Sequence, residues 1–196
     1  MPTYGLEIEL NQISDFSPTK IKLIGTNRLN WSKTHDGSFS TCSEYKFRWP
    51  TNSLYEAKQL VHQLYSCKEF VDSHKSDSRA GIHVHIGTRH SVRSWWAIEV
   101  NTLSSKNRVK LQTKVDNLTR LFLRRTRHQW CPLVLRPSAK YSPINFSSEY
   151  DTLEFRIFNS CHNARYVCKC LDWSTDLWNY MIMLYNKETS SSLSYD

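Results

Sequence analysis

Alternation of apolar and charged residues near the start of the chain constrains its fold more than any other sequence feature. Side chains of an extended strand point alternately to its two faces. Residues 3–10 therefore predict a strand with one aliphatic face, made of Leu6, Ile8 and Leu10. Glu7 and Glu9 lie on the opposite face. Such a strand can bury one side in a core and present carboxylates on the other.

The same alternation recurs twice, far along the chain. Residues 82–86 set His83 and His85 against three aliphatic residues. Residues 153–157 set Glu154 and Arg156 against three apolar residues. Three separate strands thus combine a buried face with carboxylates, imidazoles and a guanidinium, which is the composition of a metal and phosphate site.

A fourth alternating segment covers residues 44–49 and ends at Pro50. Its charged face carries Glu44, Lys46 and Arg48, opposite three aromatic residues. Two further short strands are expected at residues 21–24 and 31–35, and a turn with Asp36 and Gly37 follows.

Helical periodicity marks the remaining segments. Ser53 and Glu56 form a capping-box pattern that predicts a helix running to about Val71. Further helices are expected at residues 92–103, 111–125 and 164–187, with loops at 11–20 and 75–79 and an irregular, proline-containing stretch at 130–145.

Strands that are grouped early, without regular strand–helix alternation, favour an α+β fold with a mainly antiparallel sheet. Helices would cover one face of this sheet, and the charged face would form the floor of a concave cleft. With 196 residues, we expect one domain over residues 1–188 and a disordered serine-rich tail over residues 189–196.

The net charge of +8 and the pI near 9.2 favour an anionic partner such as a nucleotide, a nucleic acid or an acidic substrate. We find no signal-peptide pattern and no apolar segment long enough to span a bilayer. The six cysteines have no disulfide-framework density, which favours reduced thiols and a cytoplasmic protein.

The charged faces also have a simpler interpretation, since antiparallel sheets often expose one side to water. Exposed faces, however, usually mix Thr, Ser, Lys and Gln, whereas here the positions are mainly Glu, His and Arg. Neighbouring carboxylates repel one another unless a cation lies beside them. The sequence lacks the glycine-rich phosphate loops and the HExxH and GxSxG motifs. Cations and arginine would therefore have to hold any nucleotide phosphate.

Four short motifs in this order resemble the amidoligase family of carboxylate–amine ligases, which share the fold of glutamine synthetase and glutamate–cysteine ligase. They are YGLEIEL at 4–10, DGS at 36–38 with Glu44 following, GIHVHI at 81–86 and TLEFRIF at 152–158. The resemblance implies a curved antiparallel sheet with helices on its convex face. Its concave face would bind ATP with Mg²⁺ or Mn²⁺ and join a carboxylate to an amine through an acyl phosphate.

The resemblance also implies roles for individual residues. One metal ion would be held by Glu9 and Glu44, with Asp36, near the substrate carboxylate. The ion bridging the ATP phosphates would be held by Glu7, His83 and Glu154. His85, Lys140 and Asn145 would contact the nucleotide or substrate, and Arg156 the transferred phosphoryl group. A second catalytic arginine could be Arg48 or Arg136.

Three alternatives remain open at this level. The arginines at 120, 124, 125 and 127 are typical of the solvated face of a helix. With the charge of +8 they also suggest a basic nucleic-acid-binding protein, although inward-facing carboxylates would repel its phosphates. His83 and His85 with a glutamate could form the centre of a zinc hydrolase. The chain could also be a non-catalytic protein on the same fold.

Overall fold

The computed structural model describes residues 2–17, 30–35, 40–87, 104–121, 142–145 and 152–192. Within these ranges the strands are β1 (Thr3–Gln12), β2 (Trp31–His35), β3 (Cys42–Phe47), β4 (His74–Lys75), β5 (Gly81–Gly87), β6 (Ile144–Asn145) and β7 (Leu153–Asn159). The helices are α1 (Leu54–Ser66), α2 (Lys68–Asp72), α4 (Ser105–Leu121) and α5 (Ala164–Ser192).

The strands form one seven-stranded sheet in the order β2-β3-β1-β5-β7-β6, and β4 pairs with the end of β1. Every one of these strand pairs is antiparallel. The expected α+β class with an antiparallel sheet is therefore confirmed. β1 lies near the middle of the sheet, with β3 on one side and β5 on the other, which brings three of the four alternating segments side by side.

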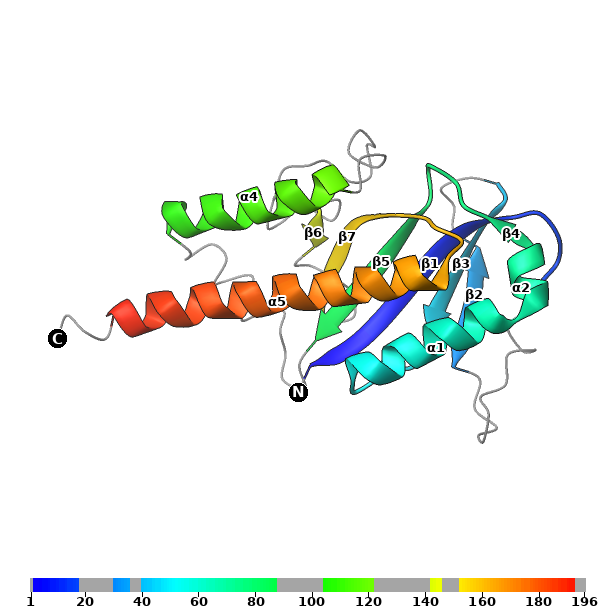
Figure 1. Cartoon of the computed structure of the whole chain (residues 1–196), viewed down its shortest axis with the longest axis horizontal. Helices are drawn as coiled ribbons and strands as arrows, with labels where there is room; N and C mark the ends of the chain where they lie inside the picture. Colours follow the sequence, from blue (N-terminus) through cyan, green and yellow to red (C-terminus); the bar gives the residue numbers. More distant parts are fainter. Residues whose placement is uncertain are drawn as a thin grey trace.

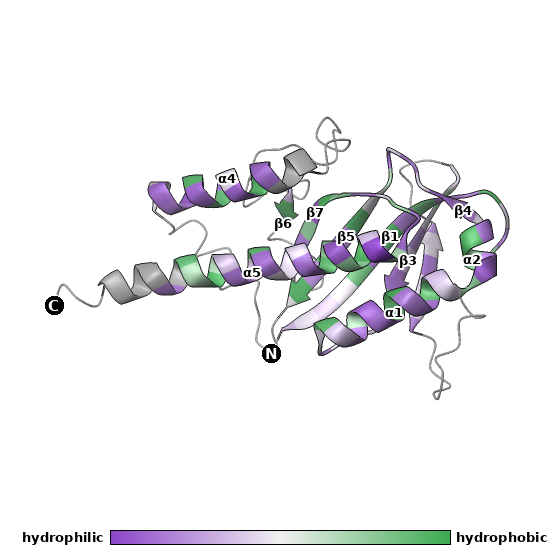
Figure 2. Cartoon of the chain, viewed as in Figure 1, coloured by the Kyte–Doolittle hydropathy of each residue, from purple (hydrophilic) through white to green (hydrophobic). Residues whose placement is uncertain are grey.

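Helices α1 and α5 lie across the same face of the sheet (Figure 1). Both alternate between hydrophobic and hydrophilic residues along their length (Figure 2), as expected for helices that cover a core. The aliphatic residues of β1 are at most 1% exposed beneath them. The capping box is confirmed at its first half, since the Ser53 hydroxyl accepts a hydrogen bond from the Glu56 amide at 3.1 Å.

Several expected boundaries are corrected. β1 continues two residues into the expected loop, because Asn11 and Gln12 pair with β4. The expected helix from residue 53 to 71 is broken at Cys67, whose extended backbone separates α1 from α2. β4 includes Lys75, and β6 occupies the end of the stretch expected to be irregular.

The later helices also differ from expectation. α4 begins at Ser105, six residues before the expected start. α5 continues to Ser192, so residues 189–192 are helical rather than part of a disordered tail. The expected strand at residues 21–24 and the expected helix at 92–103 lie outside the described residues. No helix in the described ranges combines the length and the apolar character that a transmembrane span requires.

A β-bulge interrupts the pairing of β5 with β7. Ile82 lies opposite Phe158 and Val84 lies opposite Phe155, so β7 has one extra residue in this interval. Phe158 is fully buried and stacks on Trp173 of α5 at 6.4 Å between ring centroids. Strict alternation would instead have set Phe158 on the same face as Glu154 and Arg156.

Candidate metal and phosphate site

The antiparallel register brings the charged residues of four strands together. Glu7 lies between Lys46 on β3 and His83 on β5, while His85 lies between Gly5 on β1 and Glu154 on β7. We call the whole group the charged cluster; it consists of Glu7, Glu9, Glu44, Lys46, His83, His85, Glu154 and Arg156. Its five central residues, Glu7, Glu9, His83, His85 and Glu154, are between 3 and 7% exposed. Ionisable groups are this buried only when partners satisfy them, so the solvated-face interpretation fails for these residues.

His83 links three carboxylates. Its Nδ1 lies 3.1 Å from Glu7 Oε2 and 3.3 Å from Glu154 Oε1, and its Nε2 lies 3.5 Å from Glu9 Oε1. An ionised carboxylate only accepts hydrogen bonds, so His83 is the donor in any bond that it makes to them. The imidazole ring thus links carboxylates of β1 and β7 at the centre of the charged cluster.

His85 belongs to the group that could bind a metal ion. Glu7, His85 and Glu154 each offer a ligand atom, and these atoms lie within 4.8 Å of one another. The Nδ1 of His85 is 3.0 Å from the Thr152 hydroxyl, which orients the ring, and Nε2 is 3.4 Å from Glu7 Oε1. The resemblance assigned His83 to this ion, and the structure brings both His83 and His85 close to Glu7.

Gly5 makes the position of His85 possible. The two residues lie directly opposite on neighbouring strands. A Cβ atom on Gly5 would come within 3.2 Å of the His85 Cβ, tighter than most real contacts. The glycine therefore allows the imidazole to lie close against β1, within reach of Glu7.

Arg156 and Asn145 hold Glu154 from two sides. Arg156 Nη1 donates to Glu154 Oε1, and Asn145 Nδ2 donates to Glu154 Oε2 at 2.7 Å. Asn145 reaches this carboxylate because β6 pairs with β7 exactly opposite Glu154. The expected site residues Glu154, Arg156 and Asn145 thus form one hydrogen-bonded group.

Glu9 and Glu44 lie directly opposite each other on β1 and β3. Glu9 Oε2 accepts a hydrogen bond from the Gly81 amide at 2.6 Å. Glu44 Oε2 accepts from the Thr34 hydroxyl at 2.8 Å and forms an ion pair with Lys46 at the same distance. Lys46 Nζ also lies 3.4 Å from Glu7 Oε1, so the ammonium group bridges the carboxylates of Glu44 and Glu7.

The environment shifts the pKa values of three carboxyl groups. Burial opposes ionisation of Glu7, but hydrogen bonds and charge from His83 and His85 outweigh burial and lower its pKa. Burial is likewise outweighed at Glu154 by the charges of His83, Arg156 and His85, so that pKa is lowered too. Burial and the charge of Glu7 raise the pKa of Glu44, against the opposing effect of Lys46 and Thr34. The carboxylates nearest the candidate metal position are thus ionised at neutral pH.

The described residues do not place every expected site residue in the charged cluster. Asp36, Lys140 and Arg136 lie outside the described residues. Arg48, the other candidate second arginine, is exposed beyond the end of β3. Sequence reasoning also missed contacts made by Lys46, Thr34 and Thr152. Of these three residues, only Lys46 could have been identified from the sequence, because the alternation of residues 44–49 puts it on the same face as Glu44.

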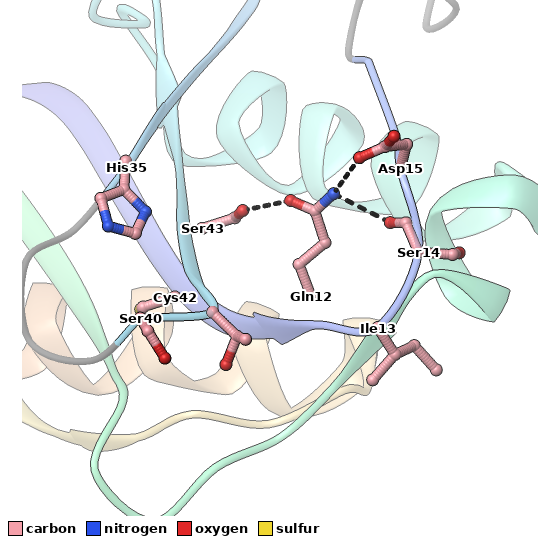
Figure 3. Close-up of a pocket in the computed structure, with 9 residues that line it drawn as sticks. Gln12, Ile13, Ser14, Asp15, His35, Ser40, Cys42 and Ser43 are labelled. Carbon is pink, nitrogen blue, oxygen red and sulfur yellow. Dashed lines mark hydrogen bonds between the residues drawn. The ribbon is translucent and has the colours of Figure 1, made fainter.

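A pocket of about 290 Å³ lies elsewhere, at the end of β1. Its polar lining includes Gln12, whose side chain accepts from Ser43 at 2.5 Å and donates to Asp15 and to the Ser14 carbonyl (Figure 3). None of the charged cluster lines this pocket. Because the Gln12 and Ser43 side chains already bond to each other in this pocket, the charged cluster is the stronger candidate site.

No protein-family model, curated protein or solved structure matches this chain. A function for this chain therefore has to be inferred from its motifs and from the geometry of the charged cluster.

Proposed function

We propose that this chain is an ATP-dependent carboxylate–amine ligase. In such a reaction a carboxylate attacks the γ-phosphate of ATP, and an amine then displaces phosphate from the resulting acyl phosphate to give an amide. The observation that carries the proposal is the convergence of buried carboxylates, imidazoles and Arg156 on one sheet face. The motif resemblance supports the same chemistry.

The donor set suits a divalent cation. Two carboxylates and one imidazole, from Glu7, Glu154 and His85, fit Mg²⁺ or Mn²⁺, which favour oxygen-rich ligation. When bound, such an ion would neutralise charge on the phosphates. Asn145 and Thr152 would keep the ligands Glu154 and His85 in position through the hydrogen bonds described above.

The chain's own residues address the main obstacle, which is the approach of a carboxylate to a phosphate. Arg156 would grip oxygens of the transferred phosphoryl group with its planar fork, and its pairing with Glu154 keeps it beside the cation. Glu9 and Glu44 would face the substrate carboxylate at the other end of the charged cluster. Asp36 and Lys140 enter the proposal through the motif resemblance alone.

The test is ATP turnover to ADP with Mg²⁺, screened against amino acids, polyamines and peptides as acid and amine. A productive pair should yield ADP, phosphate and an amide in equal amounts, and EDTA should stop the reaction. Arg156→Lys is the matched variant, because it keeps the charge and alters the donor geometry. Absence of both ATP binding and turnover over the whole panel would reject the proposal. Tight stoichiometric zinc with hydrolysis that needs no ATP would instead favour a zinc hydrolase.

A further inference from the structure

Lys46 is a fixed cation inside the charged cluster. Its Nζ lies 2.8 Å from Glu44 Oε2 and 3.4 Å from Glu7 Oε1. Its side chain is 26% exposed, while the side chains of Glu7 and Glu44 are 9 and 12% exposed. A lysine that joins two largely buried carboxylates on different strands differs from an ordinary surface ion pair.

The strand register explains why Lys46 takes this position. Lys46 is directly opposite Glu7, and Glu44, two residues earlier on the same face of β3, is directly opposite Glu9. Thr34 on β2 donates to the same Glu44 oxygen. The lysine side chain therefore spans the gap between the carboxylates of two neighbouring rows.

We propose that the Lys46 ammonium takes the place of a second metal ion, so that the charged cluster binds a single divalent cation, at Glu7, His85 and Glu154. This inference rests on the proposed function for the cation at Glu7, His85 and Glu154. It concerns the other end of the charged cluster, where Lys46 pairs with Glu44. The motif resemblance assigned a separate ion to Glu9 and Glu44. In the structure the Glu44 carboxylate already has a positive partner in Lys46.

Electrostatic repulsion opposes the binding of a second divalent ion beside the Lys46 ammonium group. An ammonium group and a divalent ion sharing the same carboxylate would lie within a few ångströms of each other in a partly buried place. Three of the four carboxylates of the cluster already pair with two permanent cations, Lys46 and Arg156. One divalent ion would neutralise the remaining charge. A second ion near Glu44 should therefore bind at least about a hundredfold more weakly while Lys46 is present.

The experiment counts Mn²⁺ ions bound per chain, without nucleotide, by calorimetry and by electron paramagnetic resonance of free Mn²⁺. The wild type should bind one ion. Lys46→Met, which keeps most of the unbranched side chain and removes its charge, should bind two, whereas Lys46→Arg should still bind one. Lys58→Met is the matched control, since Lys58 is also partly exposed (30%) and pairs with Asp172, between α1 and α5. It should bind one ion.

Two ions in the wild type, or one ion with unchanged affinity in folded Lys46→Met, would overturn the role of Lys46. The wild-type count alone tests the inference if Lys46→Met does not fold. Absence of any bound ion in the wild type would overturn the metal centre, and with it the proposed function. Two ions in a wild type that turns over ATP would reject only the inference, so the two failures are distinguishable.

Discussion

Glu7 and Glu44 share Lys46 as a partner, yet their surroundings act on them in opposite directions. The hydrogen bonds of His83 and His85 outweigh burial at Glu7 and lower its pKa, so ionisation of Glu7 stabilises the fold. At Glu44, burial and the charge of Glu7 raise the pKa, so ionisation of Glu44 costs stability. Repulsion between neighbouring carboxylates, considered alone, would have predicted the same sign for both.

Neutralising these two residues should therefore have opposite effects on the metal-free protein. In EDTA at pH 7, Glu7→Gln should lower the free energy of unfolding by about 1–3 kcal/mol, because buried imidazoles lose a charged acceptor. Glu44→Gln should leave it unchanged or raise it by up to about 1 kcal/mol. Urea unfolding of both variants beside the wild type measures this. Equal destabilisation of the two would contradict the pKa directions.

The shape of the Arg156 side chain should matter as well as its charge. Lysine keeps the charge beside Glu154 but presents a point charge instead of a planar fork. Arg156→Lys should lower the rate of ADP formation about a hundredfold, corresponding to about 3 kcal/mol of transition-state stabilisation. ATP affinity should change far less, since in the proposed site metal contacts would hold most of the triphosphate. Wild-type turnover by this variant would remove Arg156 from the mechanism.

Among the structural elements, the junction of α2, β4 and β3 contains a buried polar pair. His74 is 2% exposed; its Nδ1 lies 2.7 Å from the Phe70 carbonyl and its Nε2 lies 2.6 Å from the Tyr45 hydroxyl. The carbonyl can only accept, so Nδ1 carries the hydrogen, and in neutral His74 the Nε2 atom accepts from Tyr45. The two contacts join the short α2–β4 segment to the sheet.

The junction should make folding stability depend on pH. Burial lowers the pKa of His74 to about 4, against the opposing effect of its hydrogen bond to the Phe70 carbonyl. The unfolded chain binds this proton near pH 6.5, so the contribution is complete above about pH 6.5 and is lost as the pH falls toward 4. Between pH 7.5 and 5 the loss should be on the order of 1 kcal/mol after allowance for screening.

The comparison is urea unfolding at pH 7.5 and 5 for the wild type and for His74→Gln, which cannot titrate. The variant should be less stable at pH 7.5 and should show a smaller decrease on acidification. His162, whose pKa is also lowered by burial, titrates in the same direction in both proteins and cancels in the comparison. An identical decrease in the two proteins would exclude His74 as the source.

For the molecule as a whole, the sequence predicts the structure where a strand alternates between apolar and charged residues. It does not predict the features that depend on contacts between segments distant in sequence. The alternation of β1, β5 and β7 predicted the shared charged face, because side-chain direction follows from the extended backbone alone. The approach of both His83 and His85 to Glu7 depends on the strand register and, for His85, on the close contact at Gly5. The bulge at Phe158, the break at Cys67 and the Lys46 contacts depend on packing between segments distant in sequence. No local pattern encodes them.

The charged cluster should also couple ligand binding to the stability of the whole molecule. ATP carries several negative charges, and the cluster presents ionised Glu7 and Glu154, so ATP alone should bind weakly and leave the melting temperature nearly unchanged. ATP with Mg²⁺ at about a hundred times its dissociation constant should stabilise the fold by about 2.7 kcal/mol. For a chain of 196 residues this corresponds to an increase in melting temperature of roughly 5–10 °C.

Thermal unfolding should be followed with ATP and Mg²⁺ together, with ATP in EDTA and with Mg²⁺ alone. Glu154→Gln should abolish the increase seen with ATP and Mg²⁺, because it removes one carboxylate of the metal-binding group. Lys58→Met, which breaks an ion pair between α1 and α5, should keep the full increase from its own baseline. Equal stabilisation by ATP in EDTA would show that the phosphates are held without a cation, and the metal-dependent site would have to be abandoned.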